Sequence, residues 1–187
     1  GLAEGTPVIC GTGDSTAEAI SVGLTEPGTA FFQYGSSMFY YYCVDRMVQD
    51  YISSGGNGSV KGGKVFTIPG TFCLGDGTNA AGTLTRWVRD TFYGEELEME
   101  RKGGEAGEIQ PGSEGLMILP YIYGERSPIQ DPLATGMMFG LKGSHTRKHI
   151  NRAALEAVGY STLQHLMLFR EMGIPPHTLI TAGGGTK

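Results

Sequence analysis

Short apolar runs that end in glycine turns recur along this sequence and limit what it can fold into. Glycine accounts for 31 of the 187 residues, more than double the roughly 7% that is average for proteins. The glycines cluster between apolar runs, as in Val8-Ile9-Cys10 followed by Gly11-Thr12-Gly13-Asp14. Such clusters are typical of tight turns and of places where the backbone approaches a ligand closely. The pattern therefore predicts a globular chain with many tight turns or contacts between backbone and ligand.

Periodicity and turn residues predict an α/β fold with a mixed sheet and flanking helices. A strand-rich first half precedes alternating helices and strands. The expected strands are residues 7–10, 29–35, 38–44, 64–68, 116–119, 136–141 and 178–181. The expected helices are residues 15–24, 79–93 and 146–172, with a surface helix and loop over 95–113.

The first half contains a predicted β-hairpin. Residues 29–35 and 38–44 are rich in aromatic side chains, and Gly35-Ser36-Ser37 separates them. This spacing is typical of two antiparallel strands joined by a tight loop, and here the loop carries two hydroxyls. Pro27-Gly28, just before the hairpin, is a strong turn pattern, and we place a domain boundary there.

The longest expected helix has recognisable ends. Ser144 or Thr146 can cap its N-terminus through a side-chain hydroxyl. Gly173 can end the helix, and the prolines at 175–176 prevent it from continuing. Small residues on its apolar stripe allow close packing against neighbouring elements.

Composition argues against several classes of function. The net charge of −5 lacks the basic surface that nucleic-acid binding requires, so no nucleic-acid partner is expected. No apolar run approaches about 18 residues and no signal peptide opens the chain, so we expect no membrane segment and a cytoplasmic location. Cys10, Cys43 and Cys73 lack metal or redox spacing and are expected to be buried reduced thiols. The two ends of the sequence suggest a piece of a longer protein.

Asp14 stands out among the acidic residues. It follows an expected buried strand and a glycine-flanked turn, where a ligand can approach the backbone closely. A carboxylate there can serve a ligand site. It can also be the N-cap of the helix that follows, a role for which Ser15 is the alternative. The residues alone leave both readings open.

Other polar residues have simpler structural interpretations. Glu125, Arg126 and Asp131 are expected to form an ion pair in a loop and an Asp-Pro turn. His145 and His149 lie near a helix start without a third metal ligand, and we expect them on the helix surface.

Several motifs occur in the order and spacing of one family of enzymes. The segment Gly136-x-Met138-x-Gly140-Leu141, followed after seven residues by His149-Ile150-x-x-Ala153-Ala154-Leu155-Glu156, is similar to a signature of the FGGY carbohydrate kinases. The resemblance spans nearly the whole chain, and the residues of its motifs are most similar to those of xylulose kinases. The further motifs are Tyr34-Gly35-Ser36-Ser37-Met38-Phe39, Ala81-Gly82-x-Leu84-x-Arg86-Trp87, Leu119-Pro120-Tyr121, Gly124-Glu125-Arg126-Ser127-Pro128, Asp131-Pro132 and Ala182-Gly183-Gly184-Gly185.

The resemblance implies two ribonuclease-H-like domains of the actin and hexokinase type, with the active site in the cleft between them. Residues 1–27 then resemble the tail of the N-terminal domain. Residues 28–187 resemble most of the C-terminal, nucleotide-binding domain, which is truncated at its C-terminus. We therefore expect residues 8–10 and the helix at 15–24 to expose apolar surface that packs on the other domain.

The resemblance also implies roles for individual residues. Asp14 matches the catalytic base, which accepts a proton from a sugar hydroxyl as that hydroxyl attacks the γ-phosphoryl group of ATP. The implied nucleotide site consists of Gly35, Ser36 and Ser37 at the phosphates, Gly82 and Arg86 near the ribose and phosphates, and Gly183, Gly184 and Gly185 under the adenine and ribose. Ser36 stands where relatives often have Thr, and Arg86 where they often have Gln.

The implied function is ATP-dependent phosphorylation of a sugar or polyol hydroxyl, most closely that of a ketopentose such as xylulose, with Mg²⁺ on the phosphates. Gluconate, ribulose or glycerol kinase activity is the alternative within the family. A non-catalytic nucleotide-binding or scaffolding module is the alternative outside it, because a fold does not fix a function. A homodimer is left open, and the 187-residue chain alone is expected to be inactive.

Overall fold

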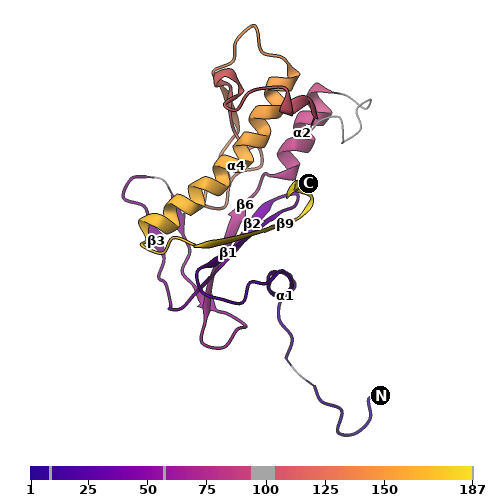
Figure 1. Ribbon diagram of the computed structural model, residues 1–187, viewed down its shortest axis with the longest axis vertical. Coiled ribbons are helices and arrows are strands. Elements are labelled where there is room, and N and C mark those ends of the chain that lie inside the picture. Colours follow the sequence, from indigo (N-terminus) through magenta and orange to yellow (C-terminus); the bar gives the residue numbers. More distant parts are fainter. Residues whose placement is uncertain (9, 57, 94–103, 187) are drawn as a thin grey trace.

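The computed structural model describes residues 1–8, 10–56, 58–93 and 104–186. Five strands form a mixed sheet in the order β5-β6-β2-β1-β9, with α4 over one face and α1 over the other, while α2 packs beside α4 beyond the end of the sheet (Figure 1). The predicted α/β class with a mixed sheet and flanking helices is confirmed. The sheet strands are β5 (Lys64–Val65), β6 (Phe72–Thr78), β2 (Met38–Val44), β1 (Thr29–Tyr34) and β9 (Thr178–Ala182). The helices are α1 (Asp14–Ser21), α2 (Gly82–Phe92) and α4 (Arg147–Glu171), with short 3₁₀ turns η1 (Ser113–Gly115) and η2 (Gly184–Thr186).

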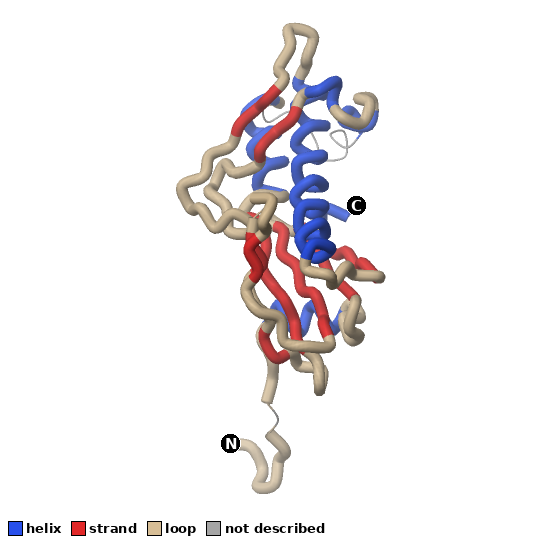
Figure 2. The backbone as a smooth tube through the Cα atoms, turned by 90° about the vertical axis from the view of Figure 1, so that its left-hand side faces the viewer, coloured by secondary structure: helices blue, strands red, loops and turns tan. Residues whose placement is uncertain are grey.

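Two small strand pairs complete the fold. β7 (Met117–Leu119) and β8 (Met137–Phe139) form an antiparallel ribbon that lies along the half of α4 farther from the sheet (Figure 2). β3 (Tyr51–Ile52) pairs with β4 (Ser59–Val60) near the other end of α4. The sequence predicted β7 and β8 but not β3 and β4. Of the predicted surface helix and loop over 95–113, residues 95–103 lie outside the described residues, and residues 104–107 are helical and lead into a loop.

The predicted β-hairpin is confirmed and forms the centre of the sheet. β1 and β2 pair antiparallel, with Ala30 opposite Tyr42 and Phe32 opposite Tyr40. Because side chains alternate between the faces of a strand, Phe32 and Tyr40 enter the core on the α4 side, whereas Phe31 enters the core on the α1 side. The aromatic runs of the two strands therefore supply both faces of the sheet with core residues.

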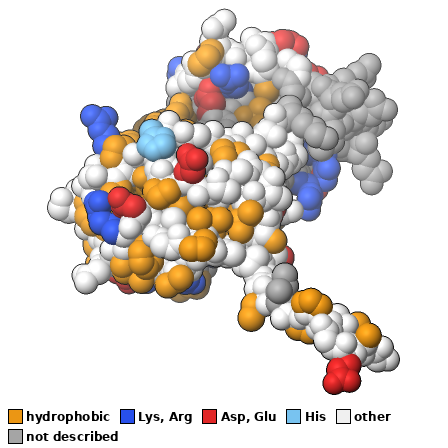
Figure 3. Space-filling view, turned by 60° about the horizontal axis from the view of Figure 1, so that its bottom comes forward, with side chains coloured by type: hydrophobic (Ala, Val, Ile, Leu, Met, Phe, Trp, Pro, Cys, Tyr) orange, Lys and Arg blue, Asp and Glu red, His pale blue; other side chains and the backbone are white. Residues whose placement is uncertain are grey.

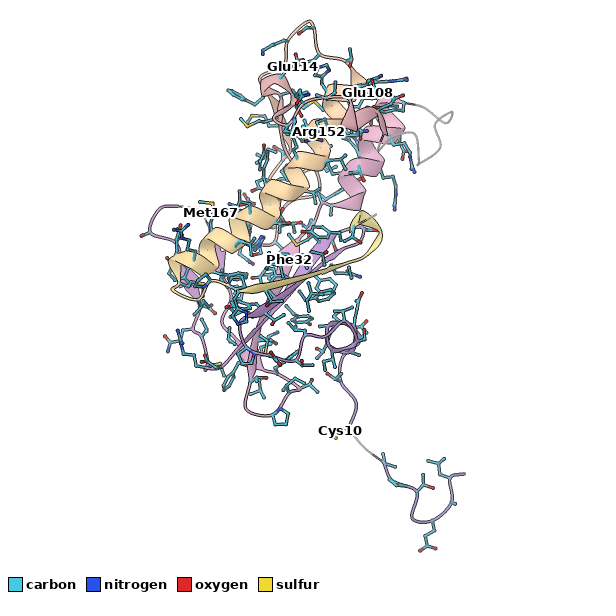
Figure 4. The ribbon with its side chains drawn as sticks, viewed as in Figure 1. Cys10, Phe32, Glu108, Glu114, Arg152 and Met167 are labelled. Carbon is cyan, nitrogen blue, oxygen red and sulfur yellow. The ribbon has the colours of Figure 1, made fainter. Side chains whose placement is uncertain are left out.

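Helix α4 anchors the core on its side of the sheet. Phe169 is fully buried, and its ring lies 5.2 Å from the ring of Tyr40 and 5.0 Å from that of Tyr42, measured between centroids. Phe32 lies beneath the same helix (Figure 4). Thr146 is the N-cap, in a capping box with His149, and Gly173 follows the helix with a φ of 72°. Both predicted helix ends are thus confirmed, with Thr146 as the cap.

Strand β6 was not predicted, although it lies inside the sheet. Gly75 and Gly77 interrupt its apolar pattern, and glycine ordinarily weakens a strand. The structure explains both residues, since a Cβ at Gly77 would lie 2.1 Å from the carbonyl oxygen of Met38, and one at Gly75 would lie 2.6 Å from the Tyr41 ring. The glycines allow β6 to approach β2 closely.

The N-terminal region differs from the prediction. The predicted strand at 7–10 is wrong, because the described residues there pair with no other strand. The described N-terminal residues project from the body of the molecule (Figure 3). Val8 is 84% exposed, as expected, whereas Cys10 is exposed and not buried. The apolar face of α1, however, is not exposed, because Ala19 packs in the core formed with Phe31 and Cys43. The division into residues 1–27 and 28–187 stays a prediction.

The close approach at Gly77 predicts an effect on stability. A Gly77→Ala substitution should destabilise the chain by about 1–3 kcal/mol, because the added methyl group overpacks the β2–β6 contact. A Gly159→Ala substitution in α4, where a Cβ would meet nothing within 4 Å, should stabilise it by about 0.5–1 kcal/mol. Urea unfolding of both variants measures these changes. A Gly77→Ala variant as stable as the unsubstituted chain would contradict this explanation of β6.

Candidate nucleotide site at the carboxyl edge of the sheet

Three glycine-containing segments meet at one edge of the sheet. β1 and β9 are parallel, with Gln33 opposite Ala182, so the turns that follow them lie at the same edge. β6 ends at this edge too, because its Thr78 is opposite Met38 of β2. Ligands of open α/β sheets commonly bind outside the carboxyl ends of strands. Gly35–Ser37, Gly82 and Gly183–Gly185 are therefore brought together, as predicted for one site.

The turn at Gly35–Ser37 is held by the first turn of α2. The carbonyl oxygen of Gly35 accepts a hydrogen bond from Gly82 N at 3.0 Å, and that of Ser36 accepts one from Ala81 N at 3.2 Å. A Cβ at Gly82 would lie 2.6 Å from the Gly35 oxygen, so only glycine allows this contact. The hydroxyls of Ser36 and Ser37 make no hydrogen bond to any described residue. They are free to bind a ligand.

The turn after β9 packs on the end of β1. Gly183 has a φ of 100°, and a Cβ there would lie 2.4 Å from the carbonyl oxygen of Tyr34; at Gly185 it would lie 2.8 Å from the Tyr34 side chain. The residues from Gly183 to Gly185 are exposed. Glycine is thus required by contact with Tyr34 on one side and leaves an open backbone surface on the other, which a flat ring can approach.

Arg86 and Asp14 stand apart from these turns. Arg86 is exposed on α2, one helical turn beyond Gly82, and pairs with none of the described residues. Asp14 is the first residue of α1, across the sheet from α2, and its Oδ1 accepts a hydrogen bond from Ser15 N at 2.7 Å. Gly13 is the N-cap, so neither Asp14 nor Ser15 has the capping role that the sequence allowed. The Asp14 carboxylate is exposed and open to a ligand.

Of two further polar residues in this region, Thr83 was missed by reasoning from the sequence and Glu125 was expected only in an ion pair. Thr83 donates its hydroxyl to the carbonyl oxygen of Ser36 at 3.0 Å. Glu125 is 2% exposed and accepts hydrogen bonds from Asn79 N at 2.9 Å and Arg126 N at 2.7 Å. Burial raises the pKa of the Glu125 carboxyl, and these two amides partly offset that rise. Only the Gly-Glu-Arg-Ser-Pro motif itself pointed to Glu125.

The roles expected for neighbouring polar residues need partial correction. Among the described ion pairs, none joins Glu125 to Arg126, because the carboxylate bonds backbone amides instead. The Asp131 turn is present, with its carboxylate accepting a hydrogen bond from Leu133 N at 2.8 Å. His149 is 7% exposed and caps α4, so it does not lie on the helix surface as expected.

Two kinds of feature are absent from the described part of the chain. No three of its His, Cys, Asp and Glu side chains are grouped to hold a metal ion. None of its helices combines the length and the apolar character needed to cross a membrane.

Known proteins share this sequence and this fold. The model of the FGGY family of carbohydrate kinases, C-terminal domain, matches residues 43–187. The chain is 34% identical to a xylulose kinase of Bacillus subtilis (strain 168) and 30% identical to a gluconokinase of the same strain, over 100% and 99% of its length. It spans 36% of the length of each of these relatives.

Solved structures give the same result. The structure of a xylulose kinase from Rhodospirillum rubrum has a TM-score of 0.83 and 28% identity, covering 99% of this chain and 36% of that one. A Plasmodium falciparum glycerol kinase with ADP, 20% identical over 92% of this chain and 34% of its own, shares the fold with a TM-score of 0.74. These neighbours confirm the predicted ribonuclease-H-like, actin and hexokinase type of fold. The chain belongs to the FGGY family of carbohydrate kinases.

Proposed function

We propose that the protein containing this chain transfers the γ-phosphoryl group of ATP to a hydroxyl of a sugar or polyol. One observation carries the proposal: the Gly35–Ser37 turn, the start of α2 at Gly82 and the exposed Gly183–Gly185 turn meet at the carboxyl edge of the sheet, in a chain of a carbohydrate kinase family. Turn amides and hydroxyls can hold phosphates without a lysine.

The proposed nucleotide site is divided among the three turns. Ser36 and Ser37 offer free hydroxyls to the phosphates, and Gly82 holds their turn in place. Gly183–Gly185 would offer a surface without side chains to the adenine and ribose, and Arg86, one helical turn beyond Gly82, would supply a positive charge near the phosphates. When bound, ATP supplies the phosphoryl group, and the Mg²⁺ that accompanies it neutralises phosphate charge.

Asp14 is proposed as the catalytic base. An exposed carboxylate at the start of a helix can accept the proton of an attacking hydroxyl as the bond to phosphorus forms. In phosphoryl transfer the position of this carboxylate matters more than its basicity, because the transition state is loose. An ordinary aspartate is therefore adequate for this role.

The substrate class rests on the relatives. The similar proteins include xylulose kinases, which supports a ketopentose such as xylulose as the substrate. A gluconokinase at 30% identity supports gluconate as the second choice. Assays with a panel of ketopentoses, gluconate and glycerol, on the product of the complete reading frame, test the proposal directly. If none of these compounds is phosphorylated in the presence of ATP, the proposal is contradicted.

The role of Asp14 predicts a specific loss of turnover. In the product of the complete reading frame, Asp14→Asn should lower kcat by about 10²- to 10⁴-fold with little change in the KM for ATP. Asp45→Asn removes a carboxylate that is also exposed and should leave kcat unchanged. Turnover of the Asp14→Asn protein near that of the unsubstituted enzyme would disprove the assignment.

The contact between Gly82 and Gly35 predicts a loss of nucleotide affinity. Gly82→Ala forces α2 away from the Gly35–Ser37 turn and should raise the KM for ATP about tenfold or more, because small displacements of positioning groups are costly. Gly159→Ala, at an exposed position of α4 where the added methyl group meets nothing within 4 Å, is the matched control. Equal KM values for the two variants would show that the turn does not bind ATP.

A further inference from the structure

Glu125 is joined to the Gly35–Ser37 turn by a short series of hydrogen bonds. Its Oε1 accepts the backbone N–H of Asn79 at 2.9 Å. The hydroxyl of Thr83 lies 3.3 Å from the carbonyl oxygen of Asn79 and 3.0 Å from that of Ser36, so its single proton is shared between the two acceptors. A buried carboxylate is therefore connected through two residues to the proposed phosphate-binding turn.

The turn depends on this region for its anchoring. The carbonyl oxygen of Ser36 lies within hydrogen-bond distance of three donors: Ala81 N at 3.2 Å, Thr83 N at 2.9 Å and the Thr83 hydroxyl at 3.0 Å. All three donors lie in residues 79–83, which join the end of β6 to the first residues of α2. The backbone of this segment therefore fixes where Ser36 and Ser37 present their hydroxyls.

The 123–127 segment fixes residues 79–83 in turn. Ser127 N donates to the carbonyl oxygen of Gly77 at 3.1 Å. The side-chain amide of Asn79 donates to the carbonyl oxygen of Tyr123, also at 3.1 Å. Glu125 provides the one side-chain acceptor that reaches the Asn79 backbone amide among the described residues. An amide left without its acceptor in a buried site is costly and displaces the chain around it.

We infer that Glu125 is a positioning residue for phosphoryl transfer, which sets the Gly35–Ser37 turn through the Asn79 amide and Thr83. The inference rests on the proposed function, because it assigns the turn to the phosphates of ATP. Glu125 is 2% exposed and so acts without touching the nucleotide. Its loss alters nucleotide binding and turnover and leaves sugar binding unchanged.

The matched pair Glu125→Met and Glu125→Gln tests this role in the product of the complete reading frame. Methionine keeps the length of the side chain but accepts no amide hydrogen bond, so the KM for ATP should rise about tenfold and kcat should fall. Glutamine keeps one carbonyl oxygen for the Asn79 amide and should stay within about threefold of the unsubstituted enzyme. The KM for the sugar should be the same in all three proteins.

Ser127→Ala controls for general destabilisation. Ser127 is fully buried on the same segment, and its hydroxyl lies 3.0 Å from Nε2 of His165, away from Asn79. This variant should lose stability without a change in the KM for ATP. If Ser127→Ala raises that KM as much as Glu125→Met does, or if Glu125→Met leaves it unchanged, Glu125 has only a structural role.

Thr83→Val supplies a second route if Glu125→Met does not fold. It removes the hydroxyl that joins Asn79 to Ser36 and should raise the KM for ATP about as much as Glu125→Met. The KM for ATP of the Glu125→Met, Thr83→Val double variant should be no higher than that of either single variant, because both substitutions interrupt the same series of hydrogen bonds. Independent, additive effects, or a Thr83→Val enzyme with an unchanged KM for ATP, would overturn the inference.

A failure of the proposed kinase activity can be told apart from a failure of the role of Glu125. An unsubstituted protein that phosphorylates no sugar would overturn the proposed kinase activity. Calorimetric titration with ADP would then still decide the role of Glu125, since the Gln variant should keep its nucleotide affinity and the Thr83→Val variant should lose it. Equal ADP affinities in the two variants would overturn the role of Glu125.

Discussion

The contact of the first turn of α2 with the Gly35–Ser37 turn is the interaction on which the candidate site depends. Two carbonyl oxygens, those of Gly35 and Ser36, accept the amides that begin α2, so the turn and the helix fix each other. Gly82 permits the approach, since any Cβ would lie 2.6 Å from the Gly35 oxygen. The hydroxyls of Ser36 and Ser37 are left over for a ligand. A binding site made chiefly of backbone follows from this geometry.

A different helix packs on each of the two faces of the sheet. On one face, Phe169 of α4 packs against Tyr40 and Tyr42 of the hairpin that carries the turn. On the other face, α1 packs through Ala19 and presents Asp14 to solvent. A hydrogen bond of 2.8 Å from Gln33 to Glu18 joins α1 to β1. Asp14 and the turns of the candidate site therefore belong to one packed unit, although they lie on different elements.

Much of this fold could be predicted because its determinants are local. The hairpin follows from aromatic runs around Gly35-Ser36-Ser37, and α4 from the residues near Thr146 and Gly173. Strand β6 could not be predicted, since the reason for Gly77 is the nearby carbonyl of Met38, which is distant in sequence. The strand expected at 7–10 fails for the opposite reason, because an apolar run needs a partner strand that the described chain does not offer it.

The candidate site likewise contains some residues that could be predicted from the sequence and others that could not. The family resemblance singled out Gly35, Gly82 and Gly183, and close contact with the carbonyl oxygens of Gly35 and Tyr34 explains the glycines at 82 and 183. The hydrogen bonds of Thr83 to Ser36 and of Glu125 to Asn79 could not be predicted, because only the tertiary structure brings them about. The family resemblance named the motif of Glu125, but burial of its carboxylate and its bond to the Asn79 amide give the motif a physical meaning.

Amide hydrogen exchange with and without a non-hydrolysable ATP analogue tests the central claim most directly. The claim is that backbone turns at the carboxyl edge of the sheet hold the nucleotide. We expect slower exchange in peptides covering residues 35–37, 79–83 and 183–185 of the product of the complete reading frame, and no change in the β3–β4 pair. Protection confined to other segments, or none at any nucleotide concentration, would contradict the claim.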